Sequence, residues 1–182
     1  MKTKKQNIYT VKKKRIIQGK TNYKKRIALV SSKKHRAVIR RSLKHLTVQF
    51  VSFDTKGDVV KVTCRSQELK KLGWDLSTSN LSASYLTGIL GAKKAKSAGI
   101  EEAIVDIGIH PSVKGSRIYA LIKGLVDGGL KVPCDPSMFP SNDRLNGKHV
   151  VDYYNMKKEN FKESPAKIHE SFEKVKNSLM KK

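Results

Sequence analysis

The chain has 182 residues, enough for one ordinary α/β domain with extensions, whereas two full domains would each lack a sufficient core. It carries 39 Lys and Arg residues against 15 Asp and Glu residues, which gives a net charge of +24 at pH 7. Because self-repulsion at this charge opposes folding, we expect a polyanionic partner, most commonly nucleic acid and less commonly an anionic membrane.

The N-terminal residues 1–26 predict a basic arm, because every charged residue among them is Lys or Arg. A block of like charge cannot collapse by itself, so we expect it to be disordered in isolation and ordered by an anionic partner. The alternative is a solvated tail or a localisation signal. Residues 27–34 fit either the end of a short helix or the approach to a first strand. The basic residues of the arm are Lys2, Lys4, Lys5, Lys12, Lys13, Lys14, Arg15, Lys20, Lys24, Lys25 and Arg26.

The stretch His35–Arg65 predicts three short β-strands, with a hairpin turn over residues 54–58. Apolar residues recur there at strand spacing, so one face of the sheet should be apolar and needs a cover of helices. We expect the other face to be exposed and cationic, with hardly an acid on it. The apolar face is assigned to Val38, Leu46, Val48, Phe50, Val60 and Val62, and the cationic face to Arg36, Arg40, Lys44, Lys61 and Arg65.

Two helices are expected to cover the apolar face. The polar run 77–80 offers N-cap residues to a helix that continues to Ala98 and ends at Gly99. A second helix is predicted from Arg117 to Asp127, where two glycines end it. Between them, residues 104–109 form a compact β-branched run, which predicts a fourth strand parallel to a neighbour. Residues 130–132 predict a short edge strand.

Beyond Cys134 the chain changes to irregular structure, followed by a last helix that Ser164-Pro165 should cap. The apolar stripe of this helix, Ile168, Phe172, Val175 and Leu179, either docks on a partner or folds back on the core. The sequence thus predicts an α/β fold in one small domain: a three-stranded, mainly antiparallel basic sheet extended by a parallel strand and covered by two helices. The expected divisions are a basic arm (1–26), a core domain (27–133) and an irregular and helical C-terminal extension (134–182).

The residues do not suggest an enzyme, a metal site or a cofactor. No glycine-rich phosphate motif opens a helix, and the five histidines are scattered. Asp106, with His110 four residues later, is the most catalytic-looking carboxylate, although a strand aspartate bonded to nearby backbone is the commoner arrangement. Cys64 alternates with valines, which is typical of a small core residue, and Cys64 and Cys134 do not form a disulfide framework, so a reducing compartment is expected. No apolar run approaches the length of a membrane span.

The segment Lys114–Arg117 lies where the second helix begins, so its free N–H groups and two cations could bind an anion. An ordinary exposed helix start is nearly as good an interpretation. Three other classes stay open for the whole chain. A chromatin or nucleoid protein would bind duplex DNA as tightly as structured RNA. A nucleic-acid-processing enzyme would need a carboxylate cluster, and a membrane-surface binder would need a basic amphipathic helix.

Several motifs, in this order and spacing, resemble the large-subunit ribosomal protein eighteen family, in its archaeal and eukaryotic-like form. They are GKTNYKKR (19–26), RRSLKH (40–45), ELKKLGW (68–74), YLTGIL (85–90), DIGIH (106–110), KGSRIYALIKGLVDGGLKVP (114–133) and GKHVVDYY (147–154). The resemblance implies a structural protein of the large subunit, on cytoplasmic ribosomes, that binds 5S rRNA and helps attach it to large-subunit rRNA in the central protuberance. Ribosomal protein five of the same subunit is the implied neighbour. It implies no catalysis, cofactor, membrane or small-molecule substrate.

The same resemblance, together with the charge of the arm, assigns the RNA contacts residue by residue. In the arm they are Lys12, Lys13, Lys14, Arg15, Lys20, Thr21, Asn22, Tyr23, Lys24, Lys25 and Arg26. On the strands they are Arg36, Arg40, Arg41, Lys44, His45 and Gln49, and in the loop before the second helix they are Lys114, Ser116 and Arg117.

Overall fold

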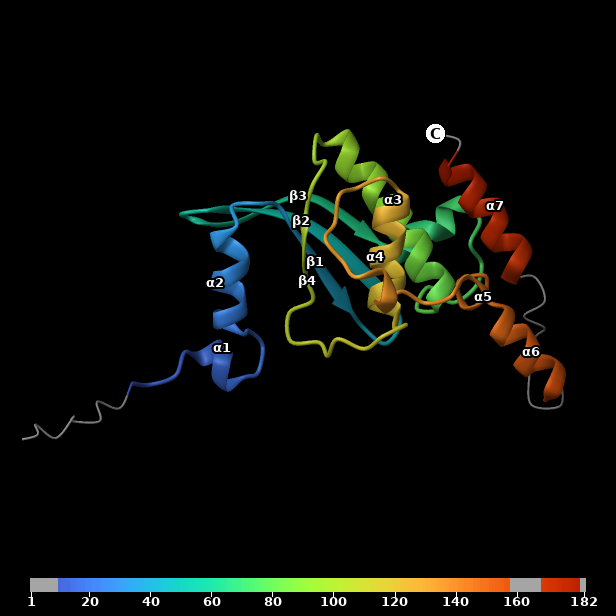
Figure 1. Ribbon diagram of the computed structural model, residues 1–182, viewed down its shortest axis with the longest axis horizontal. Helices are drawn as coiled ribbons and strands as arrows, with labels where there is room; N and C mark the ends of the chain where they lie inside the picture. Colours follow the sequence, from blue (N-terminus) through green and yellow to red (C-terminus); the bar gives the residue numbers. More distant parts are fainter. Residues whose placement is uncertain (1–9, 158–167, 181–182) are drawn as a thin grey trace, which may run out of the picture.

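The computed structural model describes residues 10–157 and 168–180, and it is built on one mixed four-stranded sheet (Figure 1). The strands lie in the order β3 (Gly57–Arg65), β2 (Leu46–Asp54), β1 (Arg36–Arg41), β4 (Ile104–Asp106). The first three are antiparallel neighbours, and β4 runs parallel to β1. The predicted hairpin and the predicted parallel fourth strand are therefore confirmed, although β4 is shorter than the run 104–109.

A β-bulge overturns part of the expected apolar face. Phe50 pairs with Val62, whereas the next residue, Val51, pairs with Val60, so Lys61 is an extra residue in β3. Val60 and Val62 consequently lie on opposite faces of the sheet. Val38 also lies on the open face, two residues from Arg36 and Arg40. The assignment of Val38 and Val60 to the apolar face was wrong, since both line a cleft on the open face, where Val38 is buried and Val60 is exposed.

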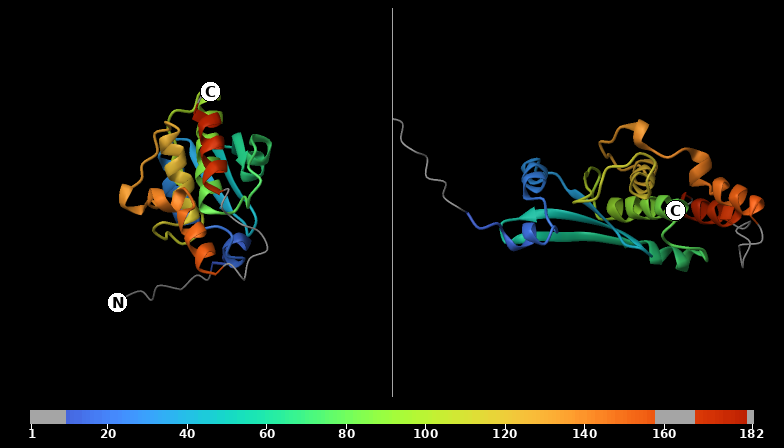
Figure 2. Two further views of the ribbon diagram at one scale, coloured as in Figure 1. Left: turned by 90° about the vertical axis from the view of Figure 1, so that its right-hand side faces the viewer. Right: turned by 90° about the horizontal axis from the view of Figure 1, so that it is seen from below.

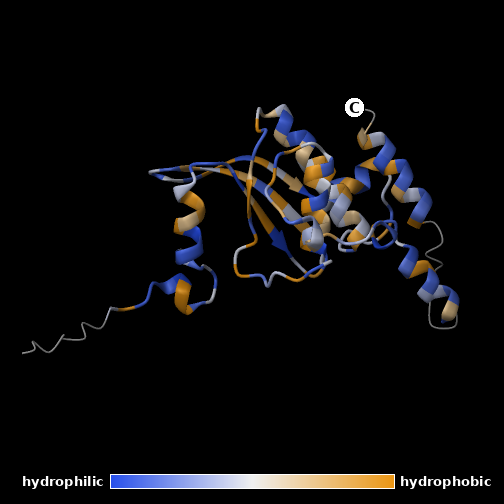
Figure 3. Ribbon diagram, in the orientation of Figure 1, coloured by the Kyte–Doolittle hydropathy of each residue, from blue (hydrophilic) through white to orange (hydrophobic). Residues whose placement is uncertain are grey.

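The helices α3 (Leu81–Ser97) and α4 (Arg117–Asp127) cover the other face, where Ala37, Ile39, Leu46, Val48, Phe50 and Cys64 are fully buried. Asn80 caps α3 as expected, because its Oδ1 accepts from the N–H of Ala83 at 2.7 Å. The predicted bounds of the second helix are those of α4. Figure 3 shows hydrophobic and hydrophilic segments alternating along the strands.

A second apolar cluster joins α3 to the C-terminal helix. The 3₁₀ helix η1 (Ser66–Leu72) and α7 (Ile168–Met180) pack beside α3, with Leu69, Trp74 and Leu86 fully buried between them. The predicted stripe of the last helix, Ile168, Phe172, Val175 and Leu179, is buried. Of the two alternatives for this helix, the described residues favour packing on the core of its own chain. The expected Ser164-Pro165 cap lies outside the described residues.

Short elements link these parts. Residues 130–132 form only one bridge, a parallel pairing of Lys131 with Glu102, in place of the predicted edge strand. The helices η2 (Pro136–Met138), α5 (Asn142–Leu145) and α6 (Lys148–Met156) follow. None of the helices in the described part of the chain is long and apolar enough to cross a membrane.

The described part of the arm forms two helices, α1 (Lys14–Ile17) and α2 (Tyr23–Ser31). The N-cap of α2 is Asn22, whose Oδ1 accepts from the N–H of Lys25 at 3.1 Å. Residues 27–31 are thus helical, and the expected division at residue 26 falls inside α2. Neither helix contains a buried residue. Both lie near the end of the β2–β3 hairpin that projects away from α3 and α4 (Figure 2).

Cys64 provides a test of this core. Burial raises the pKa of its thiol to about 12, and nearby Glu68 adds to the effect. Burial and Asp135 also raise the pKa of Cys134, but its thiol is only partly buried. Because the thiolate is the reactive form and a reagent must reach it, we expect slow modification of Cys134 alone in the folded chain and of both cysteines in denaturant. The measurement is the number of thiols titrated in each state, with Cys134→Ser as the control that abolishes the native reaction. Rapid native modification of Cys64 would contradict this packing.

Candidate nucleic-acid interface

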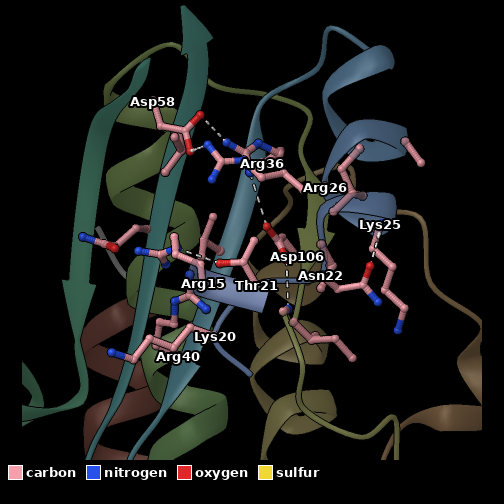
Figure 4. A pocket seen from close by; sticks show the side chains of 18 of the residues that line it. Arg15, Lys20, Thr21, Asn22, Lys25, Arg26, Arg36, Arg40, Asp58 and Asp106 are labelled. Carbon is pink, nitrogen blue, oxygen red and sulfur yellow. Dashed lines mark hydrogen bonds and ion pairs between the residues drawn. The ribbon is translucent and has the colours of Figure 1, made fainter. Parts of the chain in front are cut away.

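A cleft of about 440 Å³ separates the arm from the open face of the sheet (Figure 4). Its floor is β1, β2 and β3, one wall is α2 with the residues that precede it, and the other wall is the end of β4. Alternation along the strands brings every second side chain of β1 into it, so Arg36, Val38 and Arg40 lie in a row. The cleft therefore combines side chains of the arm and of the strands in one concave surface.

Two carboxylates lie among the cations of the cleft and form an ion network. Arg36 places Nη2 2.7 Å from Asp58 Oδ1 and Nη1 3.3 Å from Asp106 Oδ2. The other oxygen of Asp58 lies 2.8 Å from Arg26 Nη2, and Asp106 Oδ1 accepts from the N–H of Gly108 at 2.9 Å. Asp106 thus has the structural role that its strand position suggested, with a backbone bond as the sequence analysis favoured.

The expectation that Arg36 lies exposed on a cationic face was wrong. Its side chain is 3% exposed, because the side chains around it and both carboxylates enclose it. A buried guanidinium without carboxylates would be strongly destabilising, so the two acids are what allow a charge at this position. The open face of the sheet was also expected to carry hardly an acid. This was wrong, because Asp58 and Asp106 both lie beside Arg36 there.

The other cations of the cleft make no ion pair with any carboxylate of the described residues: these are Arg15, Lys20, Lys25 and Arg40. Arg15 is oriented by a bond from its Nε to Thr21 Oγ1 at 2.9 Å. Figure 4 shows Arg15, Lys20 and Arg40 on one side of the cleft, whereas the Lys25 side chain points away from them; no described carboxylate neutralises these three charges. The arrangement can hold phosphate groups, which accept hydrogen bonds from Lys and Arg.

Arg40 and Arg41, at the end of β1, lie close to His110 in the loop after β4. Burial lowers the pKa of His110, and the neighbouring charges of Arg41 and then Arg40 lower it further. The neutral ring accepts a hydrogen bond at Nδ1 from Arg41 Nε, at 3.4 Å. Burial and the two guanidinium groups together favour the neutral imidazole, so His110 adds no charge to this group of cations.

His45 has both ring nitrogens engaged within the protein. Thr78 Oγ1 donates to the carbonyl of Lys44, so it must accept from His45 Nδ1, which lies 2.9 Å away. The other nitrogen, Nε2, then accepts from the amide of Gln67 at 3.0 Å. These bonds fix the loop between β1 and β2 against the residues that precede α3. Lys44 lies in this loop next to His45, and its side chain is exposed.

The segment before α4 also contains both an exposed cation and residues that are held inside the protein. Lys114 is exposed, whereas Arg117 Nη1 donates to the carbonyl of Ser79 at 2.8 Å and so ties α4 to the start of α3. Ser116 is the N-cap of α4, but its hydroxyl makes no cap bond and is buried without a partner in the described residues. The geometry leaves Lys114 as the exposed cation of this predicted anion site, with the Asp135 carboxylate near enough to feel its charge.

Residues 7–100 match the family described as "Ribosomal large subunit proteins 60S L5, and 50S L18". Three archaeal proteins called large ribosomal subunit protein uL18 are also similar. The protein of Korarchaeum cryptofilum is 48% identical over 145 residues, which are 80% of this chain and 74% of that protein. The protein of Methanococcoides burtonii is 44% identical over 80% of this chain and 84% of its own length. That of Methanosphaera stadtmanae is 40% identical over 94% of each.

This chain belongs to the uL18 family. It is therefore a structural component of the large ribosomal subunit, not an enzyme, and its partners are ribosomal RNA and ribosomal proteins. The resemblance read from the motifs is confirmed by relatives that cover most of the chain.

The predicted RNA-contact residues of this uL18 protein fall into two groups, those that line the cleft and those that lie outside it. The structure brings together Arg15, Lys20, Thr21, Asn22, Lys25, Arg26, Arg36, Arg40 and Gln49. It places outside the cleft Lys12, Lys13, Lys14, Tyr23, Lys24, Arg41, Lys44, His45, Lys114, Ser116 and Arg117. Of these, Lys13 lies over the Tyr23 ring, with Nζ 4.5 Å from the ring centroid.

Asp58 is a residue of this site that the sequence patterns did not predict. Its only local signal was an acid next to a hairpin turn, where Asp is common for reasons of turn geometry. A less local signal was available, because Asp54 and Asp58 are the first acids of a strongly basic segment, and charged side chains are almost never fully buried unless they are paired. That signal does not name the cation, which here lies on a strand that is not its neighbour in the sheet.

Proposed function

We propose that this protein binds 5S rRNA with its arm and the open face of its sheet, and helps attach it to large-subunit rRNA in the central protuberance, beside ribosomal protein five. The observation that supports this most is the cleft, which Arg15 and Lys20 of the arm and Arg40 of β1 line without acidic partners in the described residues. Unneutralised cations in a groove are the electrostatic signature of a nucleic-acid site.

Affinity in this proposal comes from the release of counterions as Lys and Arg replace them on RNA phosphates. Such contacts carry little sequence information, so selectivity should come from the shape of the folded RNA and from unstacked bases. Arg40 offers a guanidinium plane for stacking, and Tyr23 an aromatic ring that is half-buried. Arg36 is neutralised and buried, so in this proposal it supports the site and does not contact phosphate.

The neighbouring cations outside the cleft extend the proposed footprint. Arg41, Lys44 and Lys114 are exposed: Arg41 ends β1, Lys44 lies in the β1–β2 loop and Lys114 precedes α4. Internal bonds fix this loop and the start of α4 in place. Lys12, Lys13, Lys14 and Lys24 add exposed charge along the arm. His45, Ser116 and Arg117 are proposed to hold these segments in shape.

The test is binding of the full chain to a 5S rRNA transcript, with duplex DNA as competitor. We expect a preference for 5S rRNA and, if about 6–10 phosphates are contacted, a fall in affinity of roughly 10³–10⁵-fold between 50 and 200 mM salt. Arg40→Ala with Arg41→Ala should weaken binding about tenfold or more and make the salt dependence shallower by about two contacts, while circular dichroism stays unchanged.

The matched control is Lys70→Ala with Lys71→Ala, an exposed basic pair on η1, at the end of the sheet away from the arm. It removes the same charge and should change affinity much less. Equal binding of 5S rRNA and duplex DNA would contradict the proposal and support a general polyanion binder. Attachment to large-subunit rRNA is tested separately, by asking whether the chain joins a 5S transcript to a fragment of that rRNA.

A further inference from the structure

The arm is attached to the body by very few polar contacts. Between residues 10–31 and the sheet, as far as the chain is described, the pair of Arg26 with Asp58 is the one hydrogen bond or ion pair. Neither α1 nor α2 buries a residue completely, so apolar packing adds little. The position of the arm therefore depends strongly on this pair.

Asp58 is well placed to transmit rigidity from the body to the arm. One carboxylate oxygen binds Arg36 at 2.7 Å and the other binds Arg26 at 2.8 Å, as Figure 4 shows. Arg36 lies on the central strand β1, is 3% exposed and is held from the other side by Asp106. Asp106 is fixed in turn by the N–H of Gly108. A continuous chain of charged contacts thus runs from the end of β4 across the sheet to α2.

We propose that Asp58 is a positioning residue for RNA binding: it holds α2 over the sheet, so that the cations of the arm and of the strands already form one cleft when RNA arrives. This inference rests on the proposed function. A chain whose binding-competent form is only partly populated binds with an affinity reduced by that fraction. Pre-arranging the arm avoids that loss, which is the general advantage of preorganisation.

The proposal runs against the simple effect of charge. Asp58→Asn raises the net charge of a protein that binds a polyanion, so long-range electrostatics alone would strengthen binding. If Asp58 positions the arm, the same change should weaken binding about tenfold, as a competent fraction near one tenth implies. The two effects have opposite signs, so the direction of the change separates them.

Asp54→Asn is the matched control. Asp54 lies on the same hairpin, directly opposite Gly57, and its carboxylate accepts a bond from the N–H of Thr55 without touching the arm. Both variants are made in the full chain and measured with a 5S rRNA transcript at several salt concentrations. Amide hydrogen exchange of residues 23–31 reports the order of α2 in the absence of RNA. We expect faster exchange and weaker binding in Asp58→Asn only.

A second pair of variants leaves the buried Arg36 compensated, in case Asp58→Asn destabilises the sheet. Arg26→Gln removes only the arm side of the bridge, and Lys24→Gln removes one exposed charge from the same helix. Arg26→Gln should weaken binding several-fold more than Lys24→Gln and should alone speed exchange in α2. Equal effects of this pair, or Asp58→Asn binding as tightly as Asp54→Asn, would overturn the inference while the proposed function stands. If the unaltered chain ignores 5S rRNA, the proposed function fails, and unchanged exchange in Asp58→Asn then overturns the positioning role as well.

Discussion

Removal of residues 1–31 is expected to weaken 5S rRNA binding by about 100-fold or more near physiological salt, because each lost phosphate contact also removes released counterions. The body should remain folded, since α1 and α2 contribute no buried residue to either apolar cluster. Asp58 would still neutralise Arg36 after the loss of Arg26. The measurements are the dissociation constant as a function of salt and the thermal unfolding midpoint.

A control keeps the arm but removes five of its eleven positive charges. The variant carries Gln at Lys12, Lys13, Lys14, Arg15 and Lys20. It should reproduce most of the loss in affinity, with a shallower salt dependence, because the proposed contribution of the arm to RNA binding is electrostatic. An unchanged salt dependence in the truncated chain would contradict the role of the arm. A collapse of the unfolding midpoint would instead show that the arm is part of the core.

Gly124→Ala is expected to destabilise the fold by about 3 kcal/mol or more, although alanine ordinarily favours a helix by up to about 1 kcal/mol. An added Cβ would lie 2.1 Å from the carbonyl oxygen of Tyr85 and 3.0 Å from the Cα of Gly88. Both are backbone atoms, so the clash can be relieved only by separating α3 from α4. A loss of this size is a large part of the stability of a typical domain, and denaturant unfolding would measure it.

Gly91→Ala is the comparison within the same pair of helices. Its Cβ would lie 3.0 Å from Cγ1 of Val48, a side-chain atom that can shift by a few tenths of an ångström. We expect a change of roughly 1 kcal/mol or less, because the helix preference of alanine offsets part of the crowding. Similar losses for Gly91→Ala and Gly124→Ala would mean that the close approach at Gly124 is not what limits the packing of α3 and α4.

Much of the fold followed from local patterns in the sequence. The hairpin, the start of α3 after the capping run 77–80 and the bounds of α4 were predictable because turns, N-caps and terminal glycines act within a few residues. The basic arm and the need for a polyanion followed from charge alone. The family was recognisable from the order and spacing of short motifs, and relatives that cover most of the chain confirmed it.

Contacts between distant segments were not predictable. The extra residue Lys61 reverses the faces of Val60 and Val62, and a period-two pattern cannot reveal it because register is set by the partner strand. The burial of Arg36 depends on carboxylates 22 and 70 positions away in the sequence, from Asp58 and Asp106. The placement of α7 on α3 was not predictable either, because the second apolar cluster combines residues from segments far apart in the sequence.

The sequence by itself determined that this is a basic α/β protein of the uL18 family with a cationic arm, because composition, periodicity and motif spacing are properties of the chain alone. Only the tertiary structure decided which cations are free to meet a polyanion and which are neutralised inside the protein. The reason is that ion pairing depends on distances of a few ångströms between side chains, and the fold sets those distances.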